Sequence, residues 1–164
     1  MYRTIFLGCY KVSIRIFIYN VSDPRLSGLL EVTSAHETLH AAYHRLNSSE
    51  KKHIDYLTQQ VFANIKDERI KSTVAQYRSK DPSVVPNELH SILGTEVRKL
   101  PPELEQYYKK YFSDRATIVT YSEKYEAEFT SRNNKIADYD KQLADLKGSI
   151  ESSEQKLDGQ LTDL

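Results

Sequence analysis

The sequence predicts an α+β fold that is mainly α, with a small N-terminal β-sheet packed on helices and a long C-terminal helix or coiled coil. Residues 12–19 alternate in hydropathy with a period of two, which is typical of a half-buried strand. Residues 29–112 contain runs of apolar residues at helical spacing, separated by prolines and short polar stretches. Residues 115–164 contain no proline and repeat apolar residues every seven positions, as coiled coils do.

The composition excludes several classes of protein. The 164 residues carry 23 Lys and Arg against 23 Asp and Glu, and this length suits one packed domain, or a smaller domain with an appendage. A zero net charge argues against a dedicated nucleic-acid binder, which usually has a basic surplus. The single cysteine, Cys9, excludes an internal disulfide and a cysteine-based zinc site. We expect Cys9 to be a small buried residue.

The N-terminal segment predicts a short hairpin rather than an export or membrane segment. Residues 4–9 are expected to pair with residues 12–19. Arg3, Lys11 and Arg15 interrupt the apolar run, so nothing approaches the ~20 apolar residues that a membrane span needs. We therefore expect a cytoplasmic protein without a membrane span.

Five helices are expected between the hairpin and the C-terminal segment. A turn region at residues 20–28 precedes the first helix, and prolines and polar residues separate the others. The expected helical ranges are 29–46, about 49–65, 67–77, 86–100 and 103–112, with Ser48 or Ser49 capping the second helix. Residues 1–112 would form one domain, and residues 113–164 a helical arm.

The C-terminal arm carries a heptad pattern. Apolar residues fall seven apart at Ile136, Leu143, Ile150, Leu157 and Leu164, with Tyr139 and Leu146 three residues after the first two. This a/d spacing predicts a coiled coil, or a long helix packed on a partner. The pattern weakens where Ser153 and Gln160 occupy the later d positions. We therefore predict self-association, or docking of a partner helix, through residues 136–150.

The first predicted helix contains the sequence His36-Glu37-Thr38-Leu39-His40. Residues four apart lie on one face of a helix, so both imidazoles can bind a single metal ion. Glu37 follows the first ligand directly, where its carboxylate can take a proton from a metal-bound water and pass it to a leaving amine. Two neutral imidazoles with one carboxylate suit Zn²⁺. The alternative interpretation is a helix with two surface histidines.

A third ligand is expected from a carboxylate on a later helix. His44 lies about 12 Å from His36 along the helix axis, too far to share one ion. Glu88 is favoured because it lies in the first turn of its helix, where the small Ser91 permits close packing on the first helix. Glu96 lies two turns further on, rotated by about 80°, and is the alternative ligand or a supporting group.

Other histidines and tyrosines are expected to have supporting roles. On its helix His90 diverges from Glu88, so it is available to donate to a substrate carbonyl or an oxyanion rather than to bind the metal. His53, beside two lysines, is expected to face solvent. A tyrosine cluster is expected to pack its helix over the core with exposed hydroxyls, one of which could polarise a substrate carbonyl. This cluster consists of Tyr107, Tyr108 and Tyr111.

The H-E-x-x-H sequence at 36–40 and the N-E-x-x-S sequence at 87–91 resemble the gluzincin branch of the zincin metallopeptidases, over about residues 5–112 of the chain. The resemblance implies that Glu37 is the general base. By the same resemblance, the zinc ligands are His36, His40 and Glu88. It also makes residues 14–21 the edge strand along which an extended peptide substrate pairs.

Three functions are compatible with these patterns. The first is a zinc metallopeptidase, an endopeptidase or amidase that hydrolyses a peptide or protein substrate with a metal-bound water activated by Glu37. The second is a catalytically inactive, zincin-like interaction protein that acts through its coiled-coil tail. The third is a structural zinc protein, in which the metal only joins two helices.

Overall fold

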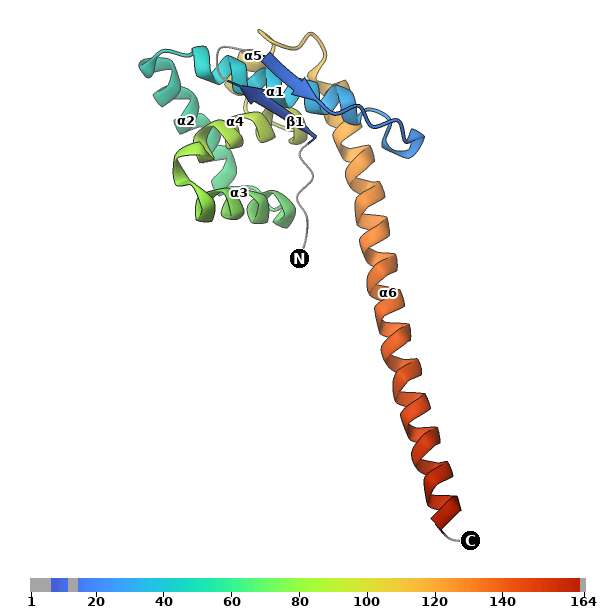
Figure 1. The fold of residues 1–164 in the computed structure, drawn as a ribbon. Helices are drawn as coiled ribbons and strands as arrows, with labels where there is room; N and C mark the ends of the chain where they lie inside the picture. Colours follow the sequence, from blue (N-terminus) through green and yellow to red (C-terminus); the bar gives the residue numbers. More distant parts are fainter. Residues whose placement is uncertain (1–6, 12–14, 163–164) are drawn as a thin grey trace. The chain divides into compact units, whose positions relative to one another are not determined.

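The computed structural model describes residues 7–11 and 15–162, which are mainly helical, with a small antiparallel sheet near the N-terminus and a long C-terminal helix (Figure 1). The predicted fold class is therefore confirmed. Residues 4–6 and 12–14 of the predicted strands lie outside the described residues. The chain divides into two compact units, residues 1–125 and 126–164. Among the described residues, no helix has the combination of length and apolar character needed to traverse a membrane.

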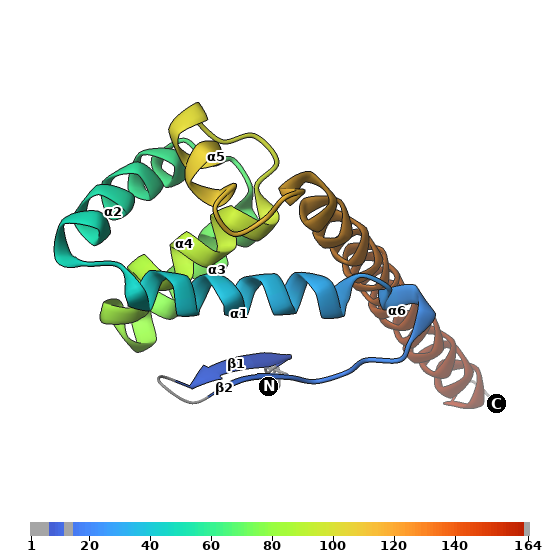
Figure 2. The same ribbon diagram turned by 90° about the horizontal axis from the view of Figure 1, so that it is seen from above.

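The sheet is a two-stranded antiparallel ladder of β1 (Gly8–Lys11) and β2 (Arg15–Ile18). Gly8 pairs with Ile18, and Lys11 pairs with Arg15. Both strands contact α1 (Leu29–Arg45), and the ladder runs alongside this helix (Figure 2). The predicted hairpin therefore packs on the helix that carries the two histidines.

The first unit contains short 3₁₀ turns as well as the predicted helices. After α1 come α2 (Ser48–Ala63), α3 (Glu68–Lys80), α4 (Val85–Glu96) and α5 (Pro102–Tyr108), with 3₁₀ turns at Pro24–Leu26 and Pro82–Val84. The last two helices end four residues before their predicted ends, at Glu96 and Tyr108. Helix α4 stops there because Val97 adopts an extended backbone conformation.

The start of α2 differs from the prediction, because Asn47 rather than Ser48 or Ser49 caps the helix. The Asn47 side-chain oxygen accepts hydrogen bonds from the backbone N–H groups of Ser49 and Glu50, at 2.9 and 3.0 Å. The Glu50 carboxylate accepts from the Asn47 N–H at 2.8 Å, which completes a capping box. One asparagine thus satisfies two helical donors that a serine inside the first turn cannot reach.

Helix α4 lies at the centre of the first unit, where it contacts α1, α2 and α3. Two apolar clusters surround it: Leu39, Ile54, Leu104, Tyr107 and Tyr108 form one, and Ile70, Val74, Leu89, Ile92 and Leu93 form the other. Gly94 lets α4 approach its neighbours closely, because a Cβ atom there would collide with Leu39 and lie 2.7 Å from the Tyr108 ring. This close packing fixes how α4 presents its first turn to α1.

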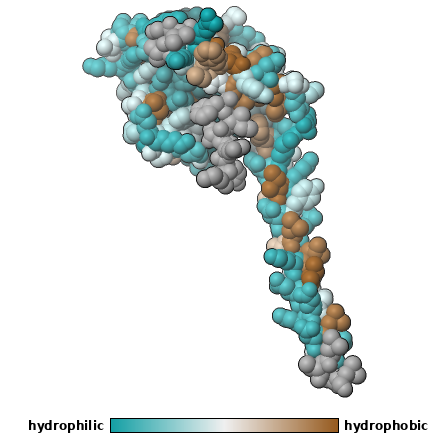
Figure 3. Space-filling model, viewed as in Figure 1, coloured by the Kyte–Doolittle hydropathy of each residue, from teal (hydrophilic) through white to brown (hydrophobic). Residues whose placement is uncertain are grey.

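The second unit is the distal part of one continuous helix, α6 (Arg115–Thr162). Every side chain from 131 to 160 is exposed. Hydrophobic side chains nevertheless recur along this helix (Figure 3). The apolar side chains of this helix between residues 131 and 160 are therefore exposed.

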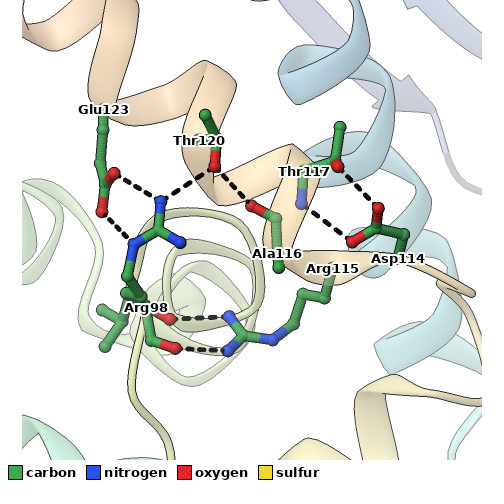
Figure 4. Close-up of polar contacts among 8 residues, drawn as sticks. Arg98, Asp114, Arg115, Ala116, Thr117, Thr120 and Glu123 are labelled. Carbon is green, nitrogen blue, oxygen red and sulfur yellow. Dashed lines mark hydrogen bonds and ion pairs between the residues drawn. The ribbon is translucent and has the colours of Figure 1, made fainter.

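The first turns of α6 belong to the first unit, where Arg115 anchors them (Figure 4). The buried Arg115 guanidinium donates to the backbone carbonyls of Val97 and Arg98, at 2.7 and 3.0 Å, and forms an ion pair with Glu105. Arg98 pairs in turn with Glu123 on α6, at 2.6 Å. These bonds satisfy the carbonyls left free where α4 ends and connect that end to α6.

Candidate metal centre

Helix α1 presents His36 and His40 one turn apart on the same face. Their rings lie edge to face with centroids 4.7 Å apart. Both side chains are half-buried or buried, yet both line an open cleft. The helical spacing therefore brings the two imidazoles together.

The first turn of α4 brings Glu88 to the same point. One Glu88 oxygen lies 3.8 Å from His36 Nε2, and the other lies 3.7 Å from His40 Nε2. One donor atom from each of the three residues lies within 4.8 Å of the others. Donors bound tetrahedrally to one ion at about 2.1 Å are about 3.4 Å apart, so small side-chain adjustments would complete a zinc site.

The protonation states of this cluster suit metal binding. Burial, reinforced by nearby His36, lowers the pKa of His40, so His40 is neutral and its ring nitrogen can act as a ligand. Burial alone would raise the pKa of Glu88, but the neighbouring imidazoles lower it below its ordinary value. Glu88 Oε2 is buried without a hydrogen-bond partner among the described residues, which is the environment of an oxygen that needs a cation.

His40 is oriented by two residues of α4. Its Nδ1 atom lies 3.1 Å from the Asn87 side-chain oxygen and 3.2 Å from the Ser91 hydroxyl. Since the asparagine oxygen only accepts hydrogen bonds, it favours a proton on Nδ1 and leaves the Nε2 lone pair directed toward Glu88. The sequence identified Asn87 as part of a motif and Ser91 as a small residue that permits close packing on the first helix. Their contact with His40 depends on how the two helices pack.

A cleft of about 460 Å³ opens over the cluster. It is lined by Gly8, Cys9 and Tyr10 of β1, by His36, Glu37, His40, Tyr43 and His44 of α1, and by Lys51, Tyr77, Ser83, Val84, Asn87 and Glu88. A second hollow of about 230 Å³ shares Gly8, His36, Glu37 and Tyr77 with it and adds the apolar Leu7, Leu29 and Val32. The open space therefore continues past the cluster.

The strand that borders this cleft is β1, whereas the sequence resemblance pointed to residues 14–21. The N–H of Tyr19 donates to the carbonyl of Leu7 at 2.8 Å, which makes these two residues a hydrogen-bonded pair. Because such pairs alternate along an antiparallel ladder, the backbone groups of Gly8 and Tyr10 face away from β2. Cys9 is exposed in this strand, so the expectation that it is buried was wrong.

The side chain of Glu37, a residue of α1, is buried against β1 and also lines the cleft. A Cβ atom on Gly8 would lie 2.6 Å from the Thr33 methyl group and 2.9 Å from Glu37 Oε1. Only glycine allows the strand to pass this close to the helix. The hairpin thus covers Glu37 while leaving its carboxylate at the edge of the open space.

The other predicted site residues lie elsewhere. Glu96 pairs with Arg69 at 2.7 Å and is not part of the cluster formed by Glu88. His44 is exposed at the cleft, and His53 is an exposed residue that contacts Glu103 at 2.8 Å. Of the two candidate glutamates, the structure therefore places only Glu88 beside the two histidines among the described residues. Metal binding by Glu88 stays a prediction.

His90 cannot contact a substrate in this structure, contrary to the sequence-based expectation. It is fully buried, its Nε2 lies 2.9 Å from the Tyr107 hydroxyl, and burial lowers its pKa to about 3. The Tyr108 hydroxyl, also buried, donates to the His90 carbonyl at 2.7 Å. Glu88 lies on the face of α4 that lines the cleft. His90, two residues later, lies on another face of the helix, which is buried in the core. The hydroxyls of Tyr107 and Tyr108 are therefore buried against His90 and cannot polarise a substrate carbonyl.

Tyr77 is a cleft residue that the sequence patterns did not identify. Burial, together with the adjacent charge of Glu88, raises the pKa of Tyr77, so its hydroxyl keeps its proton at neutral pH. It comes from the last turns of α3, where no motif marks it. Only the packing of α3 on α4 brings it to the cluster.

Comparison with known proteins finds no matching protein family, no matching curated protein and no matching solved structure. The resemblance to gluzincins therefore stays a prediction that rests on the two short motifs.

Proposed function

We propose that the protein is a zinc-dependent metallopeptidase that hydrolyses peptide bonds in an extended peptide or protein substrate. The observation that carries this proposal is the convergence of two imidazoles and one carboxylate within 4.8 Å, in a cleft that also contains Glu37. The residues that would hold the ion are His36, His40 and Glu88. Bound Zn²⁺ supplies a Lewis acid that polarises a carbonyl and lowers the pKa of water.

The protein's own residues would then move the protons. Glu37 is positioned to accept a proton from the attacking water and to deliver it to the leaving amine. The hydroxyl of Tyr77, protonated at neutral pH, can donate a hydrogen bond to the carbonyl oxygen as negative charge develops there. The backbone groups of Gly8 and Tyr10 at the free edge of β1 are available to pair with an extended substrate.

The decisive experiment separates metal binding from catalysis. Glu37→Gln should keep about one zinc per chain while cleavage of a peptide library falls by about 10²–10⁴-fold, the usual contribution of a general base. His36→Ala should lose the zinc. As a matched control, Glu31→Gln removes an exposed carboxylate from the same helix and should keep both zinc and activity. Undiminished cleavage by Glu37→Gln would refute the proposed role.

The exposed apolar face of α6 favours a second role, in which residues 136–150 bind another helix. This role is compatible with an active enzyme and also with the inactive interaction protein that the sequence leaves open. A chain that binds no zinc but associates through α6 would support the inactive alternative. A chain that binds zinc but cleaves nothing would support the structural-zinc alternative.

A further inference from the structure

The second unit exposes a row of large apolar side chains, and their exposure to water is unfavourable in a single helix. Six of them are between 51% and 63% exposed: Ile136, Tyr139, Leu143, Leu146, Ile150 and Leu157. The seven-residue spacing places them on one face over about 32 Å of helix. A regular repeat of this length is a pairing surface for another long helix rather than a pocket for a small ligand.

We propose that this face binds the same face of a second copy of the chain, as a parallel, in-register, two-stranded coiled coil. In such a pair each heptad layer meets its own counterpart, so apolar residues face apolar residues throughout 136–150. Two a positions hold Ile136 and Ile150 and one d position holds Leu146, the combination that favours two parallel strands, while the other described a positions hold Leu143 and Leu157. The layer at Ser153 contains only small hydroxyl groups.

The charges beside the seam agree with the parallel arrangement. In a parallel pair each g residue faces the e residue five positions later on the other helix. Lys135 then faces Asp140 of the second copy, and symmetry supplies this attraction twice. The next g–e′ pair, Gln142 with Lys147, contains a single charge and no repulsion.

The antiparallel alternative is less favourable on the same helix. The alignment that pairs Leu143 with Leu146 of the other copy also places Ile136 opposite Ser153. It buries Leu157 against Arg132, which leaves a charged side chain in the seam. It further brings Lys135 next to a lysine of the second copy, which is repulsive. In the parallel pair Ile136 and Leu157 each face their own counterparts, and Lys135 faces Asp140 rather than a lysine.

Cross-linking tests the orientation directly. In a Cys9→Ser background, Ser153→Cys places a thiol at a d position, where a parallel pair brings the two copies into contact. Mild oxidation should then give a disulfide-linked species of twice the 19.0 kDa chain mass. In the antiparallel alignment the two thiols would be about 25 Å apart and could not join. The outward-facing Gln155→Cys is the matched control and should stay unlinked.

Light scattering on the full chain at about 10–50 μM tests the association itself. The wild type should have twice the chain mass, and Leu143→Glu combined with Leu146→Glu should be monomeric. Lys141→Glu, a charge change away from the seam, should remain dimeric. The near-ultraviolet circular dichroism of each variant, to which the buried Tyr107 and Tyr108 contribute, checks that the first unit is folded. A monomeric wild type, a dimer that survives the double substitution, or a dimer that Ser153→Cys does not link would each overturn the proposal.

Discussion

The Nδ1 atom of His40 lies 3.1 Å from the side-chain oxygen of Asn87, the residue immediately before Glu88. Helix α4 therefore supplies both a carboxylate for the cluster and the group that orients one of its imidazoles. Such supporting hydrogen bonds raise metal affinity because they fix the tautomer and the ring orientation of the ligand. The two contributions come from adjacent residues, so they move together if α4 shifts.

Asn87→Ala should weaken zinc binding by about 10–100-fold, because His40 loses the acceptor that holds its tautomer. Competition with a chromophoric chelator measures this affinity. Asn133→Ala, which changes an exposed residue of α6, is the control and should bind zinc as the wild type does. An unchanged affinity in Asn87→Ala would show that Asn87 does not orient the ligand.

The buried His90 should make the stability of the metal-free protein depend on pH. Burial holds its pKa at about 3 in the folded chain, whereas an unfolded histidine titrates near 6.5. Between these values the unfolded state binds one more proton, so stability decreases as the pH falls, by about 1.4 kcal/mol per pH unit. His90→Gln should reduce this dependence in urea denaturation with a chelator present. Equal slopes for both proteins would contradict the assignment.

Gly94→Ala should destabilise the protein although alanine is the better helix former. The added methyl group would collide with Leu39 and the Tyr108 ring, and overpacking of this kind costs about 1–3 kcal/mol. Gly148→Ala is the matched control in a helix, since nothing lies within 4 Å of the new methyl group. Urea denaturation followed by circular dichroism compares the two. A stabilised Gly94→Ala would mean that α1 and α4 are less tightly packed.

Gly8→Ala should reduce catalysis more than metal binding. Its new methyl group would press on Thr33 and Glu37, so the proposed general base would shift while the three proposed zinc ligands stay in place. We expect a fall in kcat of at least about ten-fold, because general bases depend on their position, with zinc content unchanged. Gly159→Ala, in open space on α6, should change neither quantity. Loss of zinc from Gly8→Ala would place the effect on the metal centre instead.

Lys51 should favour substrates with a carboxylate near the scissile bond. Lys51 lines the cleft, and its amine lies 5.4 Å from the centroid of the Tyr43 ring, which also lines the cleft. Cleavage products of a peptide library, identified by mass spectrometry, should be enriched in acidic residues for the wild type. Lys51→Glu should reverse that preference, whereas Lys52→Glu, on the exposed side of α2, should preserve it. Equal preferences in all three proteins would exclude a role for Lys51.

The sequence was sufficient for features that depend on local periodicity. The spacing of His36 and His40 predicts one helical face, and the alternation around Phe17 predicts a strand. Features that depend on how two helices pack against each other could not be predicted from the sequence. Whether Glu88 or Glu96 approaches the histidines depends on how α4 packs on α1, which no periodicity encodes.

Tertiary packing, which the sequence pattern does not show, also explains why the expectation for His90 was wrong and why Tyr77 was not predicted. His90 is polar, and its burial depends on the hydrogen bond between its Nε2 and the Tyr107 hydroxyl, a contact that the sequence pattern does not show. Tyr77 has no motif around it and reaches the cleft through tertiary packing alone.

The position of β1 has a consequence for which proteins the proposed peptidase could cleave. Its edge offers backbone donors and acceptors from Gly8 and Tyr10, and these can pair only with a chain whose own backbone groups are free. Helices and the inner strands of sheets in a native protein have already used those groups. The cleft would therefore sense loss of structure, so a destabilised variant of a given protein should be cut faster than its stable parent at identical cleavage sequences.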